Sequence, residues 1–262
     1  MSLRGWPVNR VPACTLRKYL CITICLLLAG GFSPGVSFGG DWRQLAAGLD
    51  VAEFSHGGES RHALVVVRID PARRKLVVLS KKELPNEKSM SVHQWMKKYT
   101  LLAAINAGMF AQDYETHLGY MRIDGKIHSG KLTAYKSVAA FSPKQKGIAA
   151  FHIFDLDDHK DWATIKNQYN TLIQNLRLIK RPAANRWKHK PKRWSEAALG
   201  EDKEGRVLFI FSRQPYTMHD FNEKLIALPI HIHAAQHLEG GPEAQLTISV
   251  DGYERLHVEH SI

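Results

Sequence analysis

Runs of β-branched and other apolar residues, separated by short polar turns, recur along most of the chain. Residues 63–70 (ALVVVRID) and 74–80 (RKLVVLS) are two such runs, and the turn that Pro71 begins between them predicts a β-hairpin. Other runs predict strands over residues 101–105, 117–123, 137–141, 148–154, 174–179, 207–212, 231–238 and 245–250. This number of strands predicts that most of the fold is sheet.

Two segments show helical spacing instead. Residues 91–99 carry Val92, Trp95, Met96 and Tyr99 on one side, with Ser91 as a candidate N-cap. Residues 217–228 begin with a pattern like a capping box, Thr217-x-x-Asp220, and continue as an amphipathic helix. Many strands with few helices indicate the α+β class, and we expect a mixed, mainly antiparallel sheet.

The length and the absence of a long linker favour one domain over residues 40–262. A chain of 262 residues also has room for two small domains. The hydrophobic content of 44% is that of a folding protein.

Residues 1–39 differ from the rest. A basic segment (10–18) precedes an uncharged, mostly apolar segment (19–32) and then small and turn-forming residues. This order is typical of a secretory signal peptide, and the apolar run is shorter than the roughly 20 residues that span a bilayer. An uncleaved anchor is the alternative, and it is the only membrane contact we expect.

All three cysteines, Cys14, Cys21 and Cys25, lie in this segment. The remaining chain therefore has no disulfide, thiol nucleophile or cysteine metal site. An exported protein without cysteines suits a bacterial periplasm, so we expect a periplasmic or secreted location.

The net charge is +11, and four basic but no acidic residues precede residue 40. A positive surface attracts polyanions such as phosphate-bearing glycans, although it also simply keeps a protein soluble. Residues 180–194 (KRPAANRWKHKPKRW) form a basic, aromatic-containing segment that we predict to be a loop. Nucleotide-binding, serine-nucleophile and zinc-knuckle motifs are absent from the sequence, and we expect neither a cofactor nor a nucleic-acid partner.

Three segments together resemble the phosphodiester glycosidase family. They are residues 105–110 (INAGMF), 193–210 (RWSEAALGEDKEGRVLFI) and 234–246 (AAQHLEGGPEAQL), with the second predicted helix between the last two. Their order matches that of the family, over roughly residues 100–250. The resemblance implies an exported hydrolase of glycosidic or phosphodiester bonds in a glycan or sugar-phosphate polymer.

Removing a sugar from a phosphodiester needs donors that hold the phosphate and a carboxylate near the anomeric carbon. The candidate catalytic carboxylates are Glu239, which precedes a Gly-Gly turn, and Glu196 in the second block. Arg193 and Arg213 are the candidate cations. Each also has a plainer interpretation: an exposed acid on a turn for Glu239, a surface acid on a strand for Glu196, and a solvated charge for Arg213.

The remaining residues expected to bind the substrate are polar or small. Asn106 ends a predicted buried strand, where its amide either contacts the ligand or caps the turn. The others follow from the resemblance: Gly108, Ser195, Gly240 and Gly241.

Two positions depart from the family's pattern. Glu196 stands four residues before Gly200, where many members have arginine, and Glu239 opens a turn where members have aspartate. A carboxylate in place of a guanidinium reverses the charge offered to a phosphate. A protein that binds glycans or polyanions without cleaving them therefore stays open as the alternative function.

Histidines raise the possibility of a metal. His231, His233, His237 and Glu239 alternate along one predicted strand, where they could bind a divalent ion. Strand neighbours two apart diverge from a single centre, however, and 14 histidines make chance clustering easy. We therefore assign no metal ligands.

Overall fold

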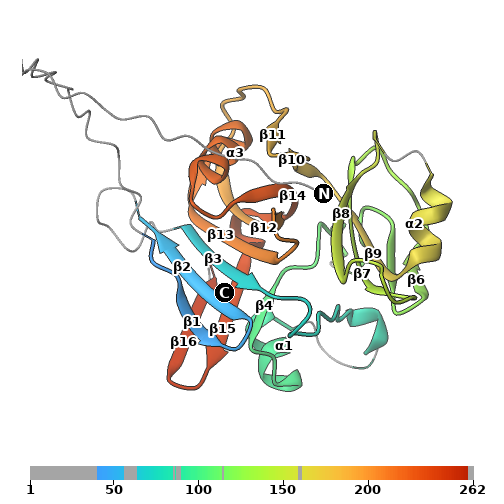
Figure 1. The fold of residues 1–262 in the computed structure, drawn as a ribbon, viewed down its shortest axis with the longest axis horizontal. Coiled ribbons are helices and arrows are strands. Elements are labelled where there is room, and N and C mark those ends of the chain that lie inside the picture. The colour runs from blue at the N-terminus through green and yellow to red at the C-terminus, as the bar shows by residue number, and fades with distance from the viewer. Residues whose placement is uncertain are drawn as a thin grey trace, which may run out of the picture. The chain divides into compact units, whose positions relative to one another are not determined.

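The computed structural model describes residues 40–55, 64–84, 86, 90–113, 115–158 and 161–258 (Figure 1). The predicted signal peptide, residues 1–39, lies outside this range. No helix within the described residues has the length and apolar character needed to cross a membrane.

An eight-stranded sheet with the strand order β1-β2-β3-β13-β12-β14-β10-β11 forms the largest part of the described structure. Its strands are β1 (Arg43–Ala46), β2 (Leu49–Phe54), β3 (Leu64–Ile69), β13 (Val207–Tyr216), β12 (Trp194–Asp202), β14 (Ile232–Gly240), β10 (Arg177–Lys180) and β11 (Ala184–Asn185). Three long strands from the second half of the chain, β12, β13 and β14, lie together in the middle of this order.

Two smaller sheets accompany it. The first has the order β16-β15-β4 and the second β6-β5-β9-β7-β8. Their strands are β4 (Ala103–Ile105), β5 (Met121–Ile123), β6 (Lys126–Ser129), β7 (Ser137–Pro143), β8 (Phe151–Asp155), β9 (Tyr169–Asn175), β15 (Gln245–Val250) and β16 (Tyr253–Val258). All the strand pairings described are antiparallel, which confirms the predicted fold class.

Both predicted helices form. In α1 (Val92–Tyr99), the Ser91 hydroxyl accepts from the Gln94 backbone N–H, and the Gln94 side chain accepts from the Ser91 N–H, which completes a capping box. In α3 (Met218–Ala227), the Thr217 hydroxyl accepts the Asp220 N–H. The patterns identified both helix starts because a cap satisfies N–H groups that the first turn leaves unpaired.

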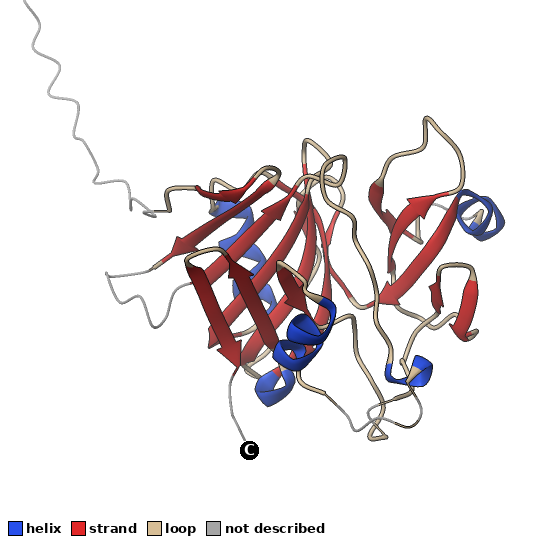
Figure 2. Ribbon diagram, turned by 90° about the horizontal axis from the view of Figure 1, so that it is seen from below, coloured by secondary structure: helices blue, strands red, loops and turns tan. Residues whose placement is uncertain are grey.

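A third helix, α2 (Trp162–Gln168), was not predicted, although Asp161 caps it. Two 3₁₀ turns, Lys81–Glu83 and Gly241–Glu243, complete the helical elements described. Figure 2 shows α2 beside the five-stranded sheet, and its Ile165 packs there against Val138 and Leu172.

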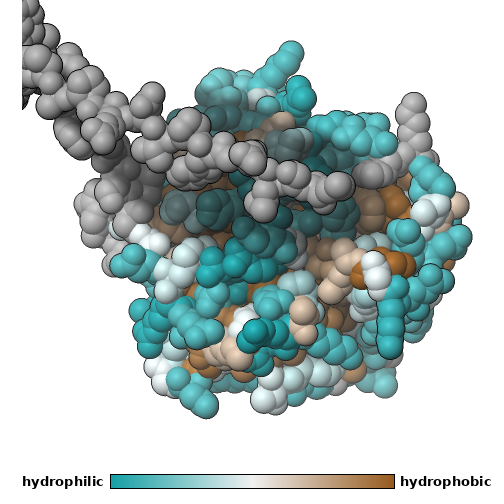
Figure 3. Space-filling view, viewed as in Figure 1, coloured by the Kyte–Doolittle hydropathy of each residue, from teal (hydrophilic) through white to brown (hydrophobic). Residues whose placement is uncertain are grey.

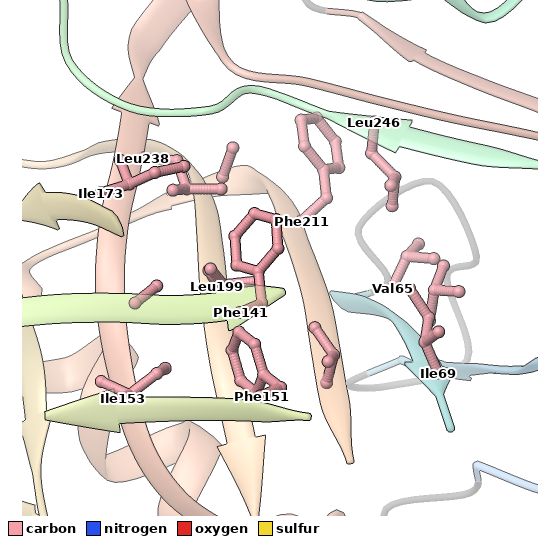
Figure 4. Close-up of a cluster of buried hydrophobic side chains, with 14 of the residues drawn as sticks. Val65, Ile69, Phe141, Phe151, Ile153, Ile173, Leu199, Phe211, Leu238 and Leu246 are labelled. Atoms are coloured by element: carbon pink, nitrogen blue, oxygen red, sulfur yellow. The ribbon is translucent and has the colours of Figure 1, made fainter. Parts of the chain in front are cut away.

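The main core lies between one face of the eight-stranded sheet and the two smaller sheets. In Figure 4, Phe141 and Phe151 of the five-stranded sheet lie among side chains of the large sheet such as Leu199 and Phe211. The opposite face of the large sheet packs against α3 through a separate apolar cluster that includes Phe221. The large sheet is therefore covered on both faces, whereas hydrophilic residues dominate the surface seen in Figure 3.

The predicted hairpin over residues 63–80 is wrong in its second half. β3 pairs with β2 and β13, and residues 74–80 form no strand. The backbone N–H groups of Arg73 and Arg74 both bond to the carbonyl of Asp70, so a turn follows directly after β3 and ends the strand. Leu76 and Val78 still pack against the core, so their apolar character reflects packing without strand pairing.

Candidate active site

A cavity of about 800 Å³ lies beside the main core. It is lined by residues from β13, α1, β4 and its following loop, the 74–81 segment, β14 and the turn before β15, including Phe209, Trp95, Asn106, Val77 and Glu239. Its size is in the range of pockets that hold small ligands. The cavity therefore brings together segments from both ends of the described chain.

Glu239 is the acidic group on the β14 side of this cavity. Its Oε1 accepts the backbone N–H of Phe110 at 3.1 Å. Burial raises the pKa of Glu239 to about 7, and the carboxylate of Glu243 also raises it, while the Phe110 N–H and His237 act in the opposite direction. A carboxyl group with a pKa near 7 exchanges a proton readily at neutral pH, as acid–base chemistry requires.

A bulge in β14 decides which way Glu239 faces. Ala197 of β12 pairs with Glu239, but the next residue, Ala198, pairs with His237, so Leu238 is the extra residue. Ala197 belongs to the main core and Ala198 to the cluster under α3. Because paired residues share a face, Glu239 faces the cavity side and His237 faces the α3 side.

The loop after β4 approaches Glu239 closely because it contains Gly108. The φ angle of this glycine is +152°, and a Cβ atom there would lie 2.5 Å from Cε1 of His117 and 2.6 Å from Oδ1 of Asn175. The same Asn175 oxygen accepts the Met109 N–H at 3.4 Å. Gly108 therefore shapes the loop that carries the Phe110 N–H, and its predicted contact with the substrate stays a prediction.

Asn106 lines the cavity and also joins two strands. Its Nδ2 donates to the carbonyl of Glu243 at 2.9 Å, and its Oδ1 accepts the N–H of Gln245 at 2.7 Å. Both atoms of the amide are thus used in closing the turn before β15. The amide thus caps a turn far away in the sequence instead of the local turn after its own strand, and the predicted contact with the substrate stays a prediction.

Glu196 is not among the residues that line this cavity. Its carboxylate bonds to Nδ1 of His237 and accepts Nε1–H of Trp194 at 2.9 Å. Glu196 and His237 are only 1% and 7% exposed. Burial lowers the pKa of His237, but the carboxylate of Glu196 outweighs burial and the net pKa is raised. Glu196 therefore forms a buried charge pair behind the strand that carries Glu239, and its predicted catalytic role stays a prediction.

Three other residues that we expected to bind the substrate, Ser195, Gly240 and Gly241, shape the turn after β14. The Ser195 hydroxyl donates to the carbonyl of Gly241 at 2.9 Å. A Cβ atom on Gly240 would lie 2.7 Å from Cδ1 of Trp194, and Gly241 has a φ of +70°. Close packing and a left-handed backbone thus explain both glycines without a ligand.

The two candidate arginines lie away from the cavity lining. Arg193 borders a separate shallow hollow, where its guanidinium is 4.0 Å from Asp220. Arg213 is exposed on β13 beside His257, whose pKa is lowered mainly by burial and further by this charge. The structure therefore joins Asn106 and Glu239 at one cavity and leaves Glu196, Arg193 and Arg213 outside its lining.

The histidines of β14 do not converge on one point. His237 is paired with Glu196, and His231 precedes the strand with a φ of +51°. Within the described residues, the group whose ligand atoms lie within 4.8 Å of one another is His189, His219 and Asp220, near the start of α3. The described histidines of this strand therefore do not form the metal site that their alternation suggested, and the group with the closest ligand atoms lies elsewhere.

Several cavity residues had no signal in the sequence. Lys81, Glu115 and Gln245 line the cavity, but nothing in their local pattern distinguishes them from surface residues. Trp95 stood out only as part of a helix face, and its ring stacks on Tyr99 with 5.6 Å between centroids. The Phe110 N–H is a backbone donor, which no side-chain motif can reveal.

Comparison with known proteins agrees with the sequence motifs. Residues 99–260, more than half of the chain, match the model of the phosphodiester glycosidase family. No protein with a curated description matches the sequence.

Two solved structures share the fold. The catalytic domain of zebrafish N-acetylglucosamine-1-phosphodiester alpha-N-acetylglucosaminidase, auto-inhibited by its pro-peptide, is 18% identical with a TM-score of 0.56, over 85% of this chain and 76% of that one. A hypothetical protein from Synechocystis is 11% identical with the same TM-score, over 84% of this chain and 61% of that one. At these identities the likeness concerns the fold.

Members of the matched family are hydrolases that act on sugars linked through phosphodiesters. The family model covers β4, the loop that carries Phe110, and the strand that carries Glu239. The chain belongs to the phosphodiester glycosidase family.

Proposed function

We propose that this protein hydrolyses the bond between the anomeric carbon of a sugar and a phosphate oxygen in a glycosyl phosphodiester. The observation that supports this most directly is Glu239, a carboxyl group on a cavity wall whose pKa is raised to about 7. A group of this kind fits the chemistry of the family to which the chain belongs.

Glu239 acts as the general base in the proposed reaction. Its carboxylate takes a proton from water, the water oxygen forms a bond to the anomeric carbon, and the bond from that carbon to the phosphate oxygen breaks with its electron pair on oxygen. The products are a free sugar and a phosphomonoester. The leaving phosphate already carries negative charge, so it needs less protonation than an alcohol would.

The backbone N–H of Phe110 orients this base. It bonds to one carboxylate oxygen, Oε1, and so fixes the direction in which the carboxylate points on the cavity wall. Lys81, whose ammonium lies 3.8 Å from Oε1 of Glu115 and donates to the carbonyl of Leu84, lines the same cavity and supplies positive charge suited to a phosphate. The proposal thus uses one carboxylate, one backbone donor and one cation.

Hydrolysis in water labelled with ¹⁸O tests the proposal. Purified protein is incubated with an alkyl diester of N-acetylglucosamine 1-phosphate, and the sugar and phosphomonoester are analysed by mass spectrometry. We expect equal amounts of both products, with the label in the sugar. Label in the phosphate would mean attack at phosphorus, and it would overturn the proposed bond cleavage.

The alternative is a protein that binds glycans or polyanions through the basic segment 180–194. Salt-sensitive binding without turnover, weakened by substitution of Lys188, Lys190 and Arg193 but not by Glu239→Gln, would favour it. We expect the reverse: turnover that Glu239→Gln abolishes and that the three substitutions at residues 188, 190 and 193 leave in place.

We also propose that the reaction takes place outside the cytoplasm, on glycans or sugar-phosphate polymers of the envelope. The support is the order of charge, apolar run and small residues over residues 1–39. Fractionation of cells and mass spectrometry of the protein's N-terminus should give an exported form that starts near residue 40. An unprocessed protein in the cytoplasm would contradict this.

A further inference from the structure

We infer that the cavity takes a glycosyl phosphodiester whose second alcohol is an aliphatic chain, so that the substrate is amphiphilic. The inference rests on the proposed function for the position of the sugar and phosphate. The aliphatic part follows from the remaining lining of the cavity.

Four polar residues of the cavity lining lie together near β14 and the end of β4, and the other polar lining residues are spread over residues 74–81 and 100–115. Asn106, Glu239, Glu243 and Gln245 come from adjacent positions, because the Asn106 amide bonds to the backbone of both Glu243 and Gln245. The carboxylates of Glu239 and Glu243 offer hydrogen-bond acceptors there, whereas the Asn106 amide is used by the turn and Gln245 Oε1 accepts the Val92 N–H. This end suits the hydroxyl groups of a sugar, and Lys81, elsewhere in the lining, is the cation suited to its phosphate.

The rest of the lining is largely apolar. On the large sheet it consists of Leu49, Ile69 and Phe209, and across from them lie residues 76–79 (LVVL) and Trp95. The side chains of these sheet residues have no polar atom, and a sugar hydroxyl placed against them would lose its hydrogen bonds to water without replacement. An alkyl chain instead gains from leaving water there.

We call the apolar part of the cavity, between Leu49, Ile69 and Phe209 on one side and residues 76–79 and Trp95 on the other, the apolar arm. The register of the sheet gives its extent. Ile69 pairs with Val207, and Glu239 pairs with Ala197, which pairs with Phe211. The step from Val207 to Phe211 spans four residues, or about 13 Å along the strands. Glu239 and Ile69 are also three strands apart, about 14 Å across the sheet, so the lining extends beyond the length of a sugar and its phosphate and has room for an alkyl chain.

The 74–80 segment supplies one wall of the arm without being part of a sheet. Among the described residues, no backbone hydrogen bond joins residues 75–79 to another element. Val77 is 46% exposed although it lines the cavity. An aliphatic ligand in the cavity would cover the apolar surface that Val77 exposes to water at the cavity border.

Binding of alkyl phosphates tests the inference separately from turnover. Octyl phosphate and methyl phosphate, both below the concentration at which micelles form, are titrated into the full-length Glu239→Gln protein by calorimetry. We expect octyl phosphate to bind at least about tenfold more tightly, because only its chain buries apolar surface. Equal affinities would overturn the inference.

Substitution of Val77 locates the chain. Val77→Asp places a charge in the arm at a half-exposed position that the core does not need, and it should remove the preference for octyl phosphate. Val77→Thr, of nearly the same shape, should keep most of that preference. A preference unchanged in Val77→Asp would place the alkyl chain elsewhere and contradict the assignment.

Turnover separates this inference from the proposed function. With methyl and octyl diesters of N-acetylglucosamine 1-phosphate, wild-type protein should show the lower KM for the octyl ester. Tight binding of octyl phosphate with no hydrolysis of either ester would contradict the proposed function and uphold the apolar arm. Hydrolysis of both esters with equal KM would uphold the function and overturn the arm.

Discussion

The backbone N–H of Phe110 donates to Oε1 of Glu239 across 129 residues of sequence. The bond joins the loop after β4 to the bulge of β14, two segments with no direct strand pairing described between them. A carboxylate held in this way keeps one orientation, because one of its oxygens is fixed by the backbone.

The first prediction concerns the reaction itself. Glu239→Gln should lower kcat/KM by about 10²- to 10⁴-fold, because an amide cannot accept the proton of water. In the wild type, the rate should rise with pH and level off above about 7, because the base works only when ionised and its pKa is raised to about 7.

Glu254→Gln is the matched control, because Glu254 is an exposed carboxylate on β16 away from the cavity. Its pH–rate profile should coincide with that of the wild type. A Glu239→Gln protein of normal activity would remove Glu239 from the mechanism.

The same carboxyl group should make the protein less stable at higher pH. The pKa of Glu239 is raised by burial from 4.5 to about 7, so the folded state holds a proton that the unfolded state has lost between these values. The free energy of unfolding therefore falls as the pH rises from about 4.5 to 7. The full pKa shift corresponds to about 3 kcal/mol. Because the group is partly exposed and screened by solvent, we expect a loss of about 1–2 kcal/mol. Glu239→Gln should remove this loss.

Chemical denaturation of both proteins at pH 5 and pH 8 measures the effect. Relative to the wild type, the variant should have a higher free energy of unfolding at pH 8 than it has at pH 5. If the difference is the same at both values, the carboxyl group is not perturbed in the folded state.

Changing one partner of the buried Glu196–His237 pair should destabilise the protein. Glu196→Gln or His237→Asn should each cost about 3 kcal/mol, because removing one partner leaves the other buried without its charge complement. The double variant should cost less than the sum of the two, as expected for side chains in direct contact. Additive costs in urea denaturation would show that the two residues act independently.

Gly108 should tolerate no side chain. Gly108→Ala forces a Cβ atom to within 2.6 Å of Asn175 Oδ1 and 2.5 Å of His117, and we expect a loss of about 3 kcal/mol together with most of the activity. Gly125→Ala is the control, because Gly125 has a φ of +88° with no atom within 4 Å of the added Cβ. It should cost only about 1 kcal/mol, from backbone strain alone.

Helix starts and the fold class could be predicted from the sequence because their causes are local. Ser91 and Thr217 cap the helices that follow them, and the hydroxyl in each case meets an N–H three residues away. The absence of strand pairing at residues 74–80 could not be predicted in this way. Their apolar spacing is the same whether they pair in a sheet or pack as an unpaired segment against the core.

The site was predictable only in part for a related reason. Strand alternation suggests which residues share a face, but one extra residue reverses the assignment, and the bulge at Leu238 is such a residue. It separates Glu239, which faces the cavity, from His237 and Glu196, which lie on the other side. The family motifs identified the right segments without giving the direction in which each side chain points.

The hydrogen bond between the Asn106 side chain and the Gln245 backbone has a consequence for the nascent chain. The pairing of β4 with β15 unites residues made early with residues made more than a hundred positions later. At ribosomal speeds this interval is on the order of ten seconds, during which a nascent chain has β4 and its loop but lacks Glu239 and β15. The proposed site can therefore form only after residues 239–245 have been synthesised, and a prematurely terminated product that stops before residue 239 would carry most strands of the large sheet without the Glu239 carboxylate.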